Sequence, residues 1–247
     1  MVDSFSSILL EGLFPNYCLL CGLRSHRRLP LCQACEGELQ VNEHCCQCCA
    51  IPLAPGIDPP ESTAGQYLCG NCLRDPPPYD RVVAPWLYCE QLAFLIQRWK
   101  YQGDRRLTPM LASLWLSQAG PITAVDAIIP VPLHWRRLWR RGFNQSELLA
   151  RQLHSLHFLI SRAELQHRSV RRRRATTAQS TIGAGQRAAN LRGAFTVLQP
   201  YANLRVAIVD DVLTTGATAA ALAGVLRRAG ASRVEVWCLA RTPAPGT

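Results

Sequence analysis

The sequence has almost no lysine: of its 27 basic residues, 26 are arginine and Lys100 is the single lysine. It also lacks any apolar run long enough to cross a bilayer, so we expect no membrane insertion. Its start, "MVDSFSSILLEGLF", has an acid and no basic leader, which predicts no secretory signal and a cytoplasmic location. A Walker A motif and a complete Rossmann fingerprint are both missing, which argues against nucleotide sites of those two kinds.

Charge is distributed unevenly along the chain. Residues 1–80 hold four arginines and nine acids, net −5, whereas residues 81–247 hold 23 basic groups and eight acids, net +15. Arginine binds phosphate through a planar fork of donors, so the basic part favours phosphorylated partners, nucleotides or nucleic acid. The alternative is a GC-rich genome that places arginine instead of lysine on solvated faces, and the charge alone does not separate the two.

Cysteine is concentrated at the other end: ten of the twelve lie within the first 72 residues, mostly as C-x-x-C pairs. In a cytoplasmic protein such pairs are typical of zinc knuckles rather than disulfides. A gap of two residues lets both thiolates reach one tetrahedral Zn²⁺. Four pairs supply ligands for one or two structural Cys₄ sites: Cys18, Cys21, Cys32, Cys35, Cys46, Cys49, Cys69 and Cys72.

The details of these sites stay open. Two assignments fit the segment "CCQCC": Cys45 with Cys48, or Cys46 with Cys49. We favour the second because Pro52 then follows the last cysteine as it often does in a knuckle turn. The four knuckles could form two sequential sites or an interleaved cross-brace, and His26 or His44 could replace a thiolate.

Proline marks the boundary between two parts of the chain. The stretch "RDPPPYD" (74–80) predicts a stiff, extended linker, and residues 52–66 are typical of a flexible loop. We therefore predict a zinc-ribbon module over residues 1–80 and a second domain over 81–247. A short N-terminal helix in the module would place these apolar residues near helical spacing: Phe5, Ile8, Leu9, Leu13 and Phe14.

The second domain alternates strands and helices. Strands are predicted at 81–88, 125–132, 205–209 and 233–241, with a further candidate at 157–160. Helices are predicted at 89–103, 107–120, 144–156 and 216–229. This alternation predicts an α/β fold with a mostly parallel sheet flanked by helices, whose ligands bind beyond the carboxyl ends of the strands.

The stretch "VAIVDDVLTTGAT" (206–218) is the strongest candidate for a ligand site. The strand ends at Asp210 and a helix begins near Gly216, so the backbone amides of residues 214–218 would converge on an anion. Three hydroxyls add donors there: Thr214, Thr215 and Thr218. Asp210 and Asp211 could accept hydrogen bonds from hydroxyls nearby, and the combination suits a sugar phosphate.

A second candidate is "VPLHWRRLWRRGFNQ" (131–145), which also follows a strand. Its arginines are candidates for pyrophosphate or DNA phosphates: Arg136, Arg137, Arg140 and Arg141. If the run is helical, Trp135 and Trp139 share a face, and stacking aromatics beside arginine are the mixture that single-strand binding uses. The alternative is that the tryptophans belong to the core and the arginines are merely solvated.

These segments occur in an order that resembles the ComF family. The resemblance covers nearly the whole chain: four knuckles, "RWKYQGDRRL", "RGFNQS", "RRATTAQS", "RAANLRGAF" and "VDDVLTTGAT". It implies a double zinc ribbon followed by a type I phosphoribosyltransferase-like domain. It also implies a role in natural transformation, handling incoming single-stranded DNA beside competence proteins such as a helicase or a recombination mediator.

The resemblance also implies roles for single residues. Asp210 and Asp211 would hold the ribose hydroxyls of phosphoribosyl pyrophosphate (PRPP), which binds with Mg²⁺. The 5′-phosphate would lie in the loop Thr214, Thr215, Gly216, Ala217 and Thr218. Lys100 matches a family lysine that reaches a phosphate. Residues 169–181 match a hood loop over PRPP, with Arg174, Thr176 and Gln179, although Arg171 to Arg174 could instead contact a DNA backbone. Three functions remain: a PRPP-binding protein of DNA uptake, an active phosphoribosyltransferase with an unknown acceptor, or a purine-salvage enzyme with a zinc appendage.

Overall fold

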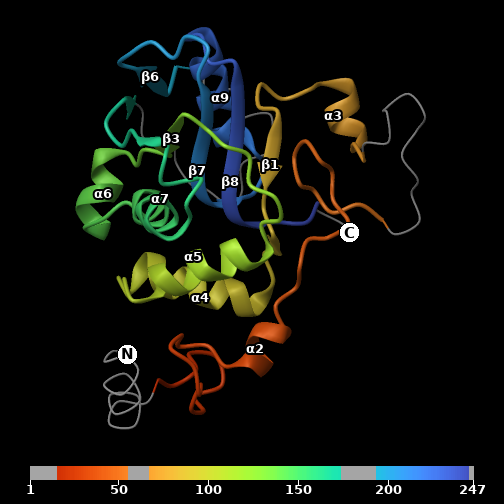
Figure 1. Cartoon of the computed structure of the whole chain (residues 1–247), viewed down its shortest axis with the longest axis vertical. Helices are drawn as coiled ribbons and strands as arrows, with labels where there is room; N and C mark the ends of the chain where they lie inside the picture. Colours follow the sequence, from red (N-terminus) through yellow and green to blue (C-terminus); the bar gives the residue numbers. More distant parts are fainter. Residues whose placement is uncertain (1–15, 55–66, 174–192, 245–247) are drawn as a thin grey trace.

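The computed structural model describes residues 16–54, 67–173 and 193–244 (Figure 1). The predicted N-terminal helix lies outside these ranges, as does most of the predicted loop 52–66. The predicted hood-loop residues also lie outside them: Arg174, Thr176 and Gln179. Among the described helices, none is long and apolar enough to cross a membrane.

A parallel sheet forms the centre of the chain (Figure 1). Its order is β1–β8–β7–β3–β4, and β2 pairs with β8 further along than β1 does. The strands are β1 (Arg81–Val83), β2 (Trp86–Leu87), β3 (Ala127–Pro130), β4 (Glu164–Leu165), β7 (Arg205–Leu213) and β8 (Arg233–Arg241). The central strands are apolar almost throughout because both faces of the sheet are covered.

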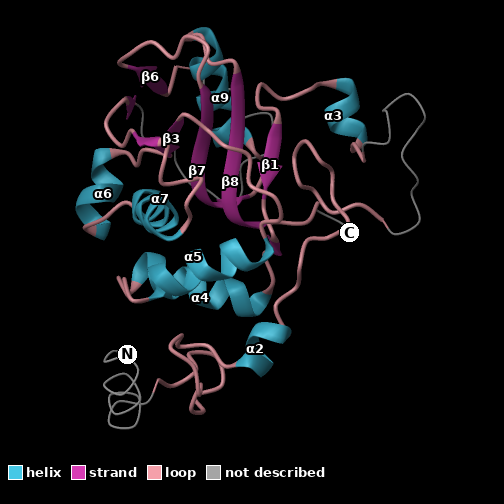
Figure 2. Cartoon of the chain, in the orientation of Figure 1, coloured by secondary structure: helices cyan, strands magenta, loops and turns pink. Residues whose placement is uncertain are grey.

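Helices cover the two faces, as Figure 2 shows. One face packs against α4 (Glu90–Tyr101), α5 (Leu107–Gln118) and α7 (Gln145–Leu156). The other packs against α9 (Ala217–Arg228) and against an antiparallel pair, β5 (Val170–Arg172) with β6 (Phe195–Val197). In β7, Ala207 and Val209 face the first group of helices while Val206 and Ile208 face the second. The predicted α/β class with a mostly parallel sheet flanked by helices is confirmed.

In the cysteine-rich part, the described residues include two short helices, α2 (Gln33–Gly37) and α3 (Gly70–Arg74). Its first half joins the core on the α4–α5 face, where Leu31 and Leu39 are buried. Its second half joins the core on the α9 face, where Cys46 and Ala50 are buried. The first half therefore packs with the layer of α4 and α5, and the second half packs with the core on the α9 side of the sheet.

Residues 40–42 connect these halves along the edge of the sheet. The Leu87 amide donates to the Gln40 carbonyl, and the Asn42 amide donates to the Pro85 carbonyl, both at 2.8 Å. The Asn42 side chain donates to the carbonyls of Ala50 at 2.9 Å and Ala84 at 3.1 Å. This segment thus covers backbone groups at the edge beside β2 that would otherwise be open to another strand.

The linker before β1 is held against the α/β part. Asp80 accepts a hydrogen bond from the Val234 amide at 2.7 Å and forms an ion pair with Arg227. Arg227 also donates to the Pro78 carbonyl at 3.2 Å. These contacts hold Pro78 and Asp80, the two neighbours of the buried Tyr79, against the α/β part. The division into domains at residue 80 stays a prediction.

Three predicted elements differ from the structure. The strand expected at 205–209 continues to Leu213, because Val212 and Leu213 still pair with β8. The strand expected at 81–88 is divided into β1 and β2, with Pro85, which has no amide to donate, between them. The candidate strand at 157–160 is wrong: these residues form a turn after α7 that buries Ile160 and leaves Phe158 67% exposed.

Candidate functional site

Two carboxylates, Asp210 and Asp211, lie on consecutive residues near the end of β7, and we call them the acid pair. Each contacts a polar side chain from the first turn of α7. The Ser146 hydroxyl donates to Asp210 at 3.0 Å, and the Gln145 side-chain amide donates to Asp211 at 2.7 Å. Both α7 residues are buried, so helix α7 and strand β7 hold the acid pair in place together.

Lys100, near the end of α4, contributes the positive charge at this site. Its ammonium lies 2.9 Å from the Asp211 carboxylate, and both side chains are mostly buried. Burial alone would lower the pKa of Lys100, but the Asp211 and Asp210 carboxylates outweigh it and raise the pKa. The single lysine of the chain is therefore a charged partner of the acid pair.

Asp210 has no such cation in contact among the ion pairs of the described residues. Burial, together with the adjacent Asp211 carboxylate, raises the pKa of Asp210 to about 7. Hydrogen bonds from the Asp211 amide and the Ser146 hydroxyl act in the opposite direction and only partly offset this rise. Asp210 is therefore partly protonated near neutral pH.

The loop of residues 214–218 follows directly after β7 and leads into α9. Gly216 caps the helix with φ +76°, a conformation that favours glycine. A Cβ at this position would lie 3.2 Å from the Tyr79 hydroxyl, so a side chain would also be crowded. Since the first amides of a helix have no partner within it, the loop presents donors beside the acid pair.

The arginine-rich segment forms a helix, α6 (Trp135–Arg141), between β3 and α7. Arg141 belongs to the site: it donates to the Gln145 side chain, which holds Asp211, and stacks 5.2 Å from the centre of the Tyr101 ring. Arg136 and Arg140 are exposed instead, and Arg136 stacks on Trp135. Arg137 is half-buried.

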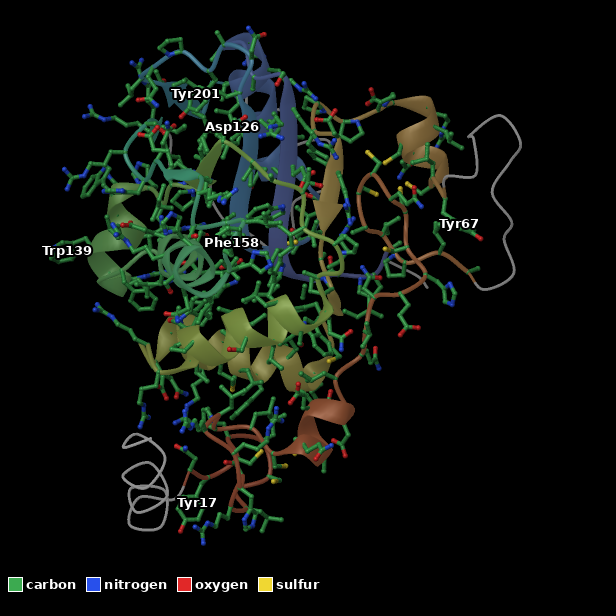
Figure 3. All side chains as sticks on the ribbon, in the orientation of Figure 1. Tyr17, Tyr67, Asp126, Trp139, Phe158 and Tyr201 are labelled. Carbon is green, nitrogen blue, oxygen red and sulfur yellow. The ribbon has the colours of Figure 1, made fainter. Side chains whose placement is uncertain are left out.

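The tryptophans of α6 face solvent. Trp135 is 65% exposed and Trp139 is 87% exposed, and Figure 3 shows Trp139 projecting outward from the helix. The interpretation that these two residues belong to the core is therefore wrong. The helix presents aromatic rings and guanidinium groups together on the surface.

Sequence reasoning located most of this site but missed three of its members. The sequence predicts only a helix at Gln145 and Ser146. Two polar residues at the start of a helix could, however, have indicated contacts to a site at the neighbouring strand ends. Arg241, at the end of β8, gave no signal because its partners are distant in sequence. It is buried and donates to backbone carbonyls of Cys49, Leu213 and Thr214.

The cysteines form two groups of four. Cluster 1 consists of Cys18, Cys21, Cys32 and Cys35, and cluster 2 consists of Cys46, Cys49, Cys69 and Cys72. Within each cluster all four sulfur atoms lie within 4.8 Å of one another. The sulfurs of Cys21 and Cys32 are 3.8 Å apart and those of Cys49 and Cys69 are 3.7 Å apart. Tetrahedral Zn–S bonds of about 2.3 Å require separations of roughly 3.8 Å, so both clusters fit structural zinc.

This grouping favours two sequential sites over an interleaved cross-brace. Neither His26 nor His44 takes part, and the "CCQCC" segment contributes its second and fifth letters. One thiol in each cluster is readily ionised. Burial opposes ionisation of Cys18, but amides of Cys21 and Cys32 outweigh it and lower its pKa to about 6. A hydrogen bond from Cys49 lowers the pKa of Cys46 to about 4.

Comparison with known proteins covers both parts of the chain. Residues 9–73 match the double zinc ribbon domain. The chain is 36% identical to the "DNA utilization protein YhgH" of Salmonella typhimurium, over 92% of this chain and 98% of that protein. The same values hold for the protein of that name in Escherichia coli K12. "Competence protein F" of Haemophilus influenzae is 34% identical over 85% of this chain and 90% of that protein.

We expect two zinc ions per chain. Cys46→Ser should leave one, because it removes a ligand of cluster 2, whereas Cys45→Ser should leave two. Elemental analysis of the purified proteins measures this directly. A loss of zinc with Cys45→Ser and none with Cys46→Ser would assign the ligands the other way.

We expect Asp210→Asn to stabilise the protein at pH 8. The fold favours the protonated carboxyl, so its contribution to stability is complete below about pH 4 and is lost as the pH rises through about 7. Asparagine does not titrate, so the variant should gain roughly 4 kcal/mol at pH 8 relative to pH 4. Urea unfolding of both proteins without Mg²⁺ tests this. If the difference in unfolding free energy between the two proteins does not vary with pH, ionisation of Asp210 does not destabilise the fold.

Proposed function

This chain belongs to the ComF family, and we propose on that premise that it binds PRPP at the acid pair and handles single-stranded DNA during DNA uptake. The observation that carries the proposal is the position of Asp210 and Asp211, held by Ser146 and Gln145 directly before the 214–218 loop. Names of relatives that refer to DNA utilization and to competence support the DNA part.

The site offers separate partners for the parts of a phosphoribosyl group. The 5′-phosphate would accept hydrogen bonds from the amides of the 214–218 loop. The N-terminal end of α9, which lies there, also favours negative charge. The ribose hydroxyls would donate to the acid pair. A carboxylate is a suitable acceptor for them because it offers lone pairs without competing donors.

The pyrophosphate part would meet the cations of α4 and α6. Lys100 and Arg141 both lie at the acid pair, one through a direct ion pair and the other through Gln145. An incoming pyrophosphate would draw these cations toward its own oxygens. Mg²⁺, which accompanies such ligands, would offset the charge that pyrophosphate brings close to the carboxylates.

We expect calorimetry to detect Mg²⁺–PRPP binding to the zinc-loaded protein. Asp211→Asn should weaken it at least tenfold, because the variant loses a hydroxyl acceptor and the partner of Lys100. Asp126→Asn is the matched control: this acid pairs with Arg205 at the start of β7, at the opposite end of the strand from the acid pair. Absence of binding to the wild type, or an equal effect of both variants, would overturn the PRPP assignment.

Single-stranded DNA would bind along α6. Exposed Trp135 and Trp139 offer faces on which bases stack, and Arg136 and Arg140 offer charge to the backbone beside them. This helix ends next to the acid pair, because Arg141 closes α6 and contacts Gln145. DNA on α6 and PRPP at the acid pair would therefore be neighbours.

We expect the affinity for an oligothymidylate to fall steeply with salt, since phosphate contacts release counterions. Trp139→Ala should weaken binding by about 5-fold to 100-fold, from the loss of one stacked base. Phe158→Ala is the matched control, because Phe158 is also an exposed ring with an arginine, Arg162, stacked 4.2 Å away. Fluorescence anisotropy at several salt concentrations measures both effects. Equal losses in the two variants would show that α6 is not the site.

The alternative function is an active phosphoribosyltransferase with an unknown acceptor. In that case pyrophosphate would leave C1 of the ribose as the acceptor attacks, and the acid pair would hold the sugar during the displacement. Release of pyrophosphate from PRPP in the presence of candidate acceptors, absent in Asp211→Asn, distinguishes an enzyme from a protein that only binds PRPP.

A further inference from the structure

Arg241 joins two parts of the molecule that the sequence separates widely. Its side chain is buried at the end of β8. The Nε atom donates to the Cys49 carbonyl at 3.1 Å, and Nη1 donates to the Leu213 carbonyl at 3.0 Å and to the Thr214 carbonyl. Among the described residues, no carboxylate forms an ion pair with this guanidinium. Backbone carbonyls therefore satisfy a buried charge.

The carbonyls on either side belong to different functional units. Cys49 is a ligand candidate of cluster 2, so its backbone position depends on the knuckle. Leu213 and Thr214 are the last residue of β7 and the first of the 214–218 loop. One rigid, planar group thus spans the knuckle and the loop, and its donors are directed by its fixed geometry.

A second contact connects the same two units. The Tyr79 hydroxyl lies against Gly216, close enough that a Cβ there would be 3.2 Å away. The carbonyl of Tyr79 lies 4.0 Å from the Cys48 sulfur, within the "CCQCC" turn of cluster 2. Residues beside cluster 2 therefore contact the loop at two points, Thr214 and Gly216.

Cluster 1 has no comparable route to the loop within the described residues. Its buried members, Cys18 and Cys35, pack with α4 and α5 on the opposite face of the sheet. Arg241 and Tyr79, which both contact the loop, belong instead to the surroundings of cluster 2. Both clusters therefore offer four thiolates, but within the described residues only cluster 2 is connected to the 214–218 loop.

We infer that cluster 2 positions the 214–218 loop through Arg241, so that zinc at cluster 2, and not at cluster 1, determines how well the loop is ordered. Loss of the metal would release the Cys49 knuckle and remove an acceptor from a buried guanidinium, which is costly unless the group moves. Movement of Arg241 would then release the carbonyls of Leu213 and Thr214. The ordering of the loop does not depend on the proposed function, whereas its effect on PRPP rests on it.

Hydrogen exchange tests the inference without any ligand. The Thr242 amide donates to the Leu213 carbonyl and the Ala220 amide donates to the Gly216 carbonyl, so these two amides report on the loop. The Val131 amide, which donates a hydrogen bond to the Val209 carbonyl in the middle of β7, is the internal reference. Cys69→Ser removes a ligand of cluster 2, and Cys21→Ser removes one of cluster 1 as the matched control. Zinc content is measured on the same samples.

We expect exchange at Thr242 and Ala220 to be at least tenfold faster in Cys69→Ser and in Arg241→Gln, with Val131 and Cys21→Ser unchanged. Unchanged loop exchange in a Cys69→Ser protein that has lost one zinc would overturn the inference, as would equal acceleration by Cys21→Ser. Arg241→Gln keeps the test decisive if Cys69→Ser does not fold, because it leaves all eight thiols in place.

A binding measurement with Mg²⁺–PRPP distinguishes failure of this inference from failure of the proposed function. In calorimetry, Mg²⁺–PRPP should bind Cys69→Ser at least tenfold more weakly than wild type, and Cys21→Ser like wild type. If the wild type itself does not bind PRPP, the proposed function fails while the exchange result still decides the role of Arg241. If PRPP binds all three alike, the support from cluster 2 has no effect on the site.

Discussion

Repulsion between two adjacent carboxylates at the end of a buried strand is the constraint around which the α/β part is arranged. The helices on the α4–α7 face that reach the acid pair bring the compensating groups. Lys100 comes from α4, and Gln145 and Ser146 come from α7. Arg141 adds a guanidinium from α6 through Gln145. A site this negative at the end of a sheet would be costly without them, and its compensation favours ligands that carry anionic groups of their own.

Patterns that depend on neighbours in sequence predicted the fold well. Helix α4 follows from apolar periodicity, α5, α7 and α9 follow from the alternation of strand-like and helix-like segments, and the acid pair with its loop follows from a strand, a glycine and a helix in succession. Contacts across long distances in sequence were not predictable in the same way. Arg241 and Cys49 are 192 residues apart, and only the folded sheet brings them together. The extent of β7 depended likewise on pairing with β8.

Metal ligands show the same limit at shorter range. Spacing within each C-x-x-C pair identified the knuckles, because two thiolates of one pair reach a common ion through local geometry. Spacing between pairs did not decide which knuckles share an ion, since that depends on the path of the chain around the sheet. The structure groups the first two pairs beside α4 and α5 and the last two on the α9 side, so each candidate site is built from consecutive knuckles.

The segment of residues 40–42 gives the cysteine-rich part a protective role that metal binding does not describe. It pairs with the backbone beside β2 while the knuckles at its two ends cover apolar surface on both faces. Without it, the sheet would present an open strand edge flanked by uncovered apolar side chains, which is the surface that recruits strands from other copies. The cysteine-rich part thus closes one edge of the sheet in addition to covering apolar surface of the α/β part.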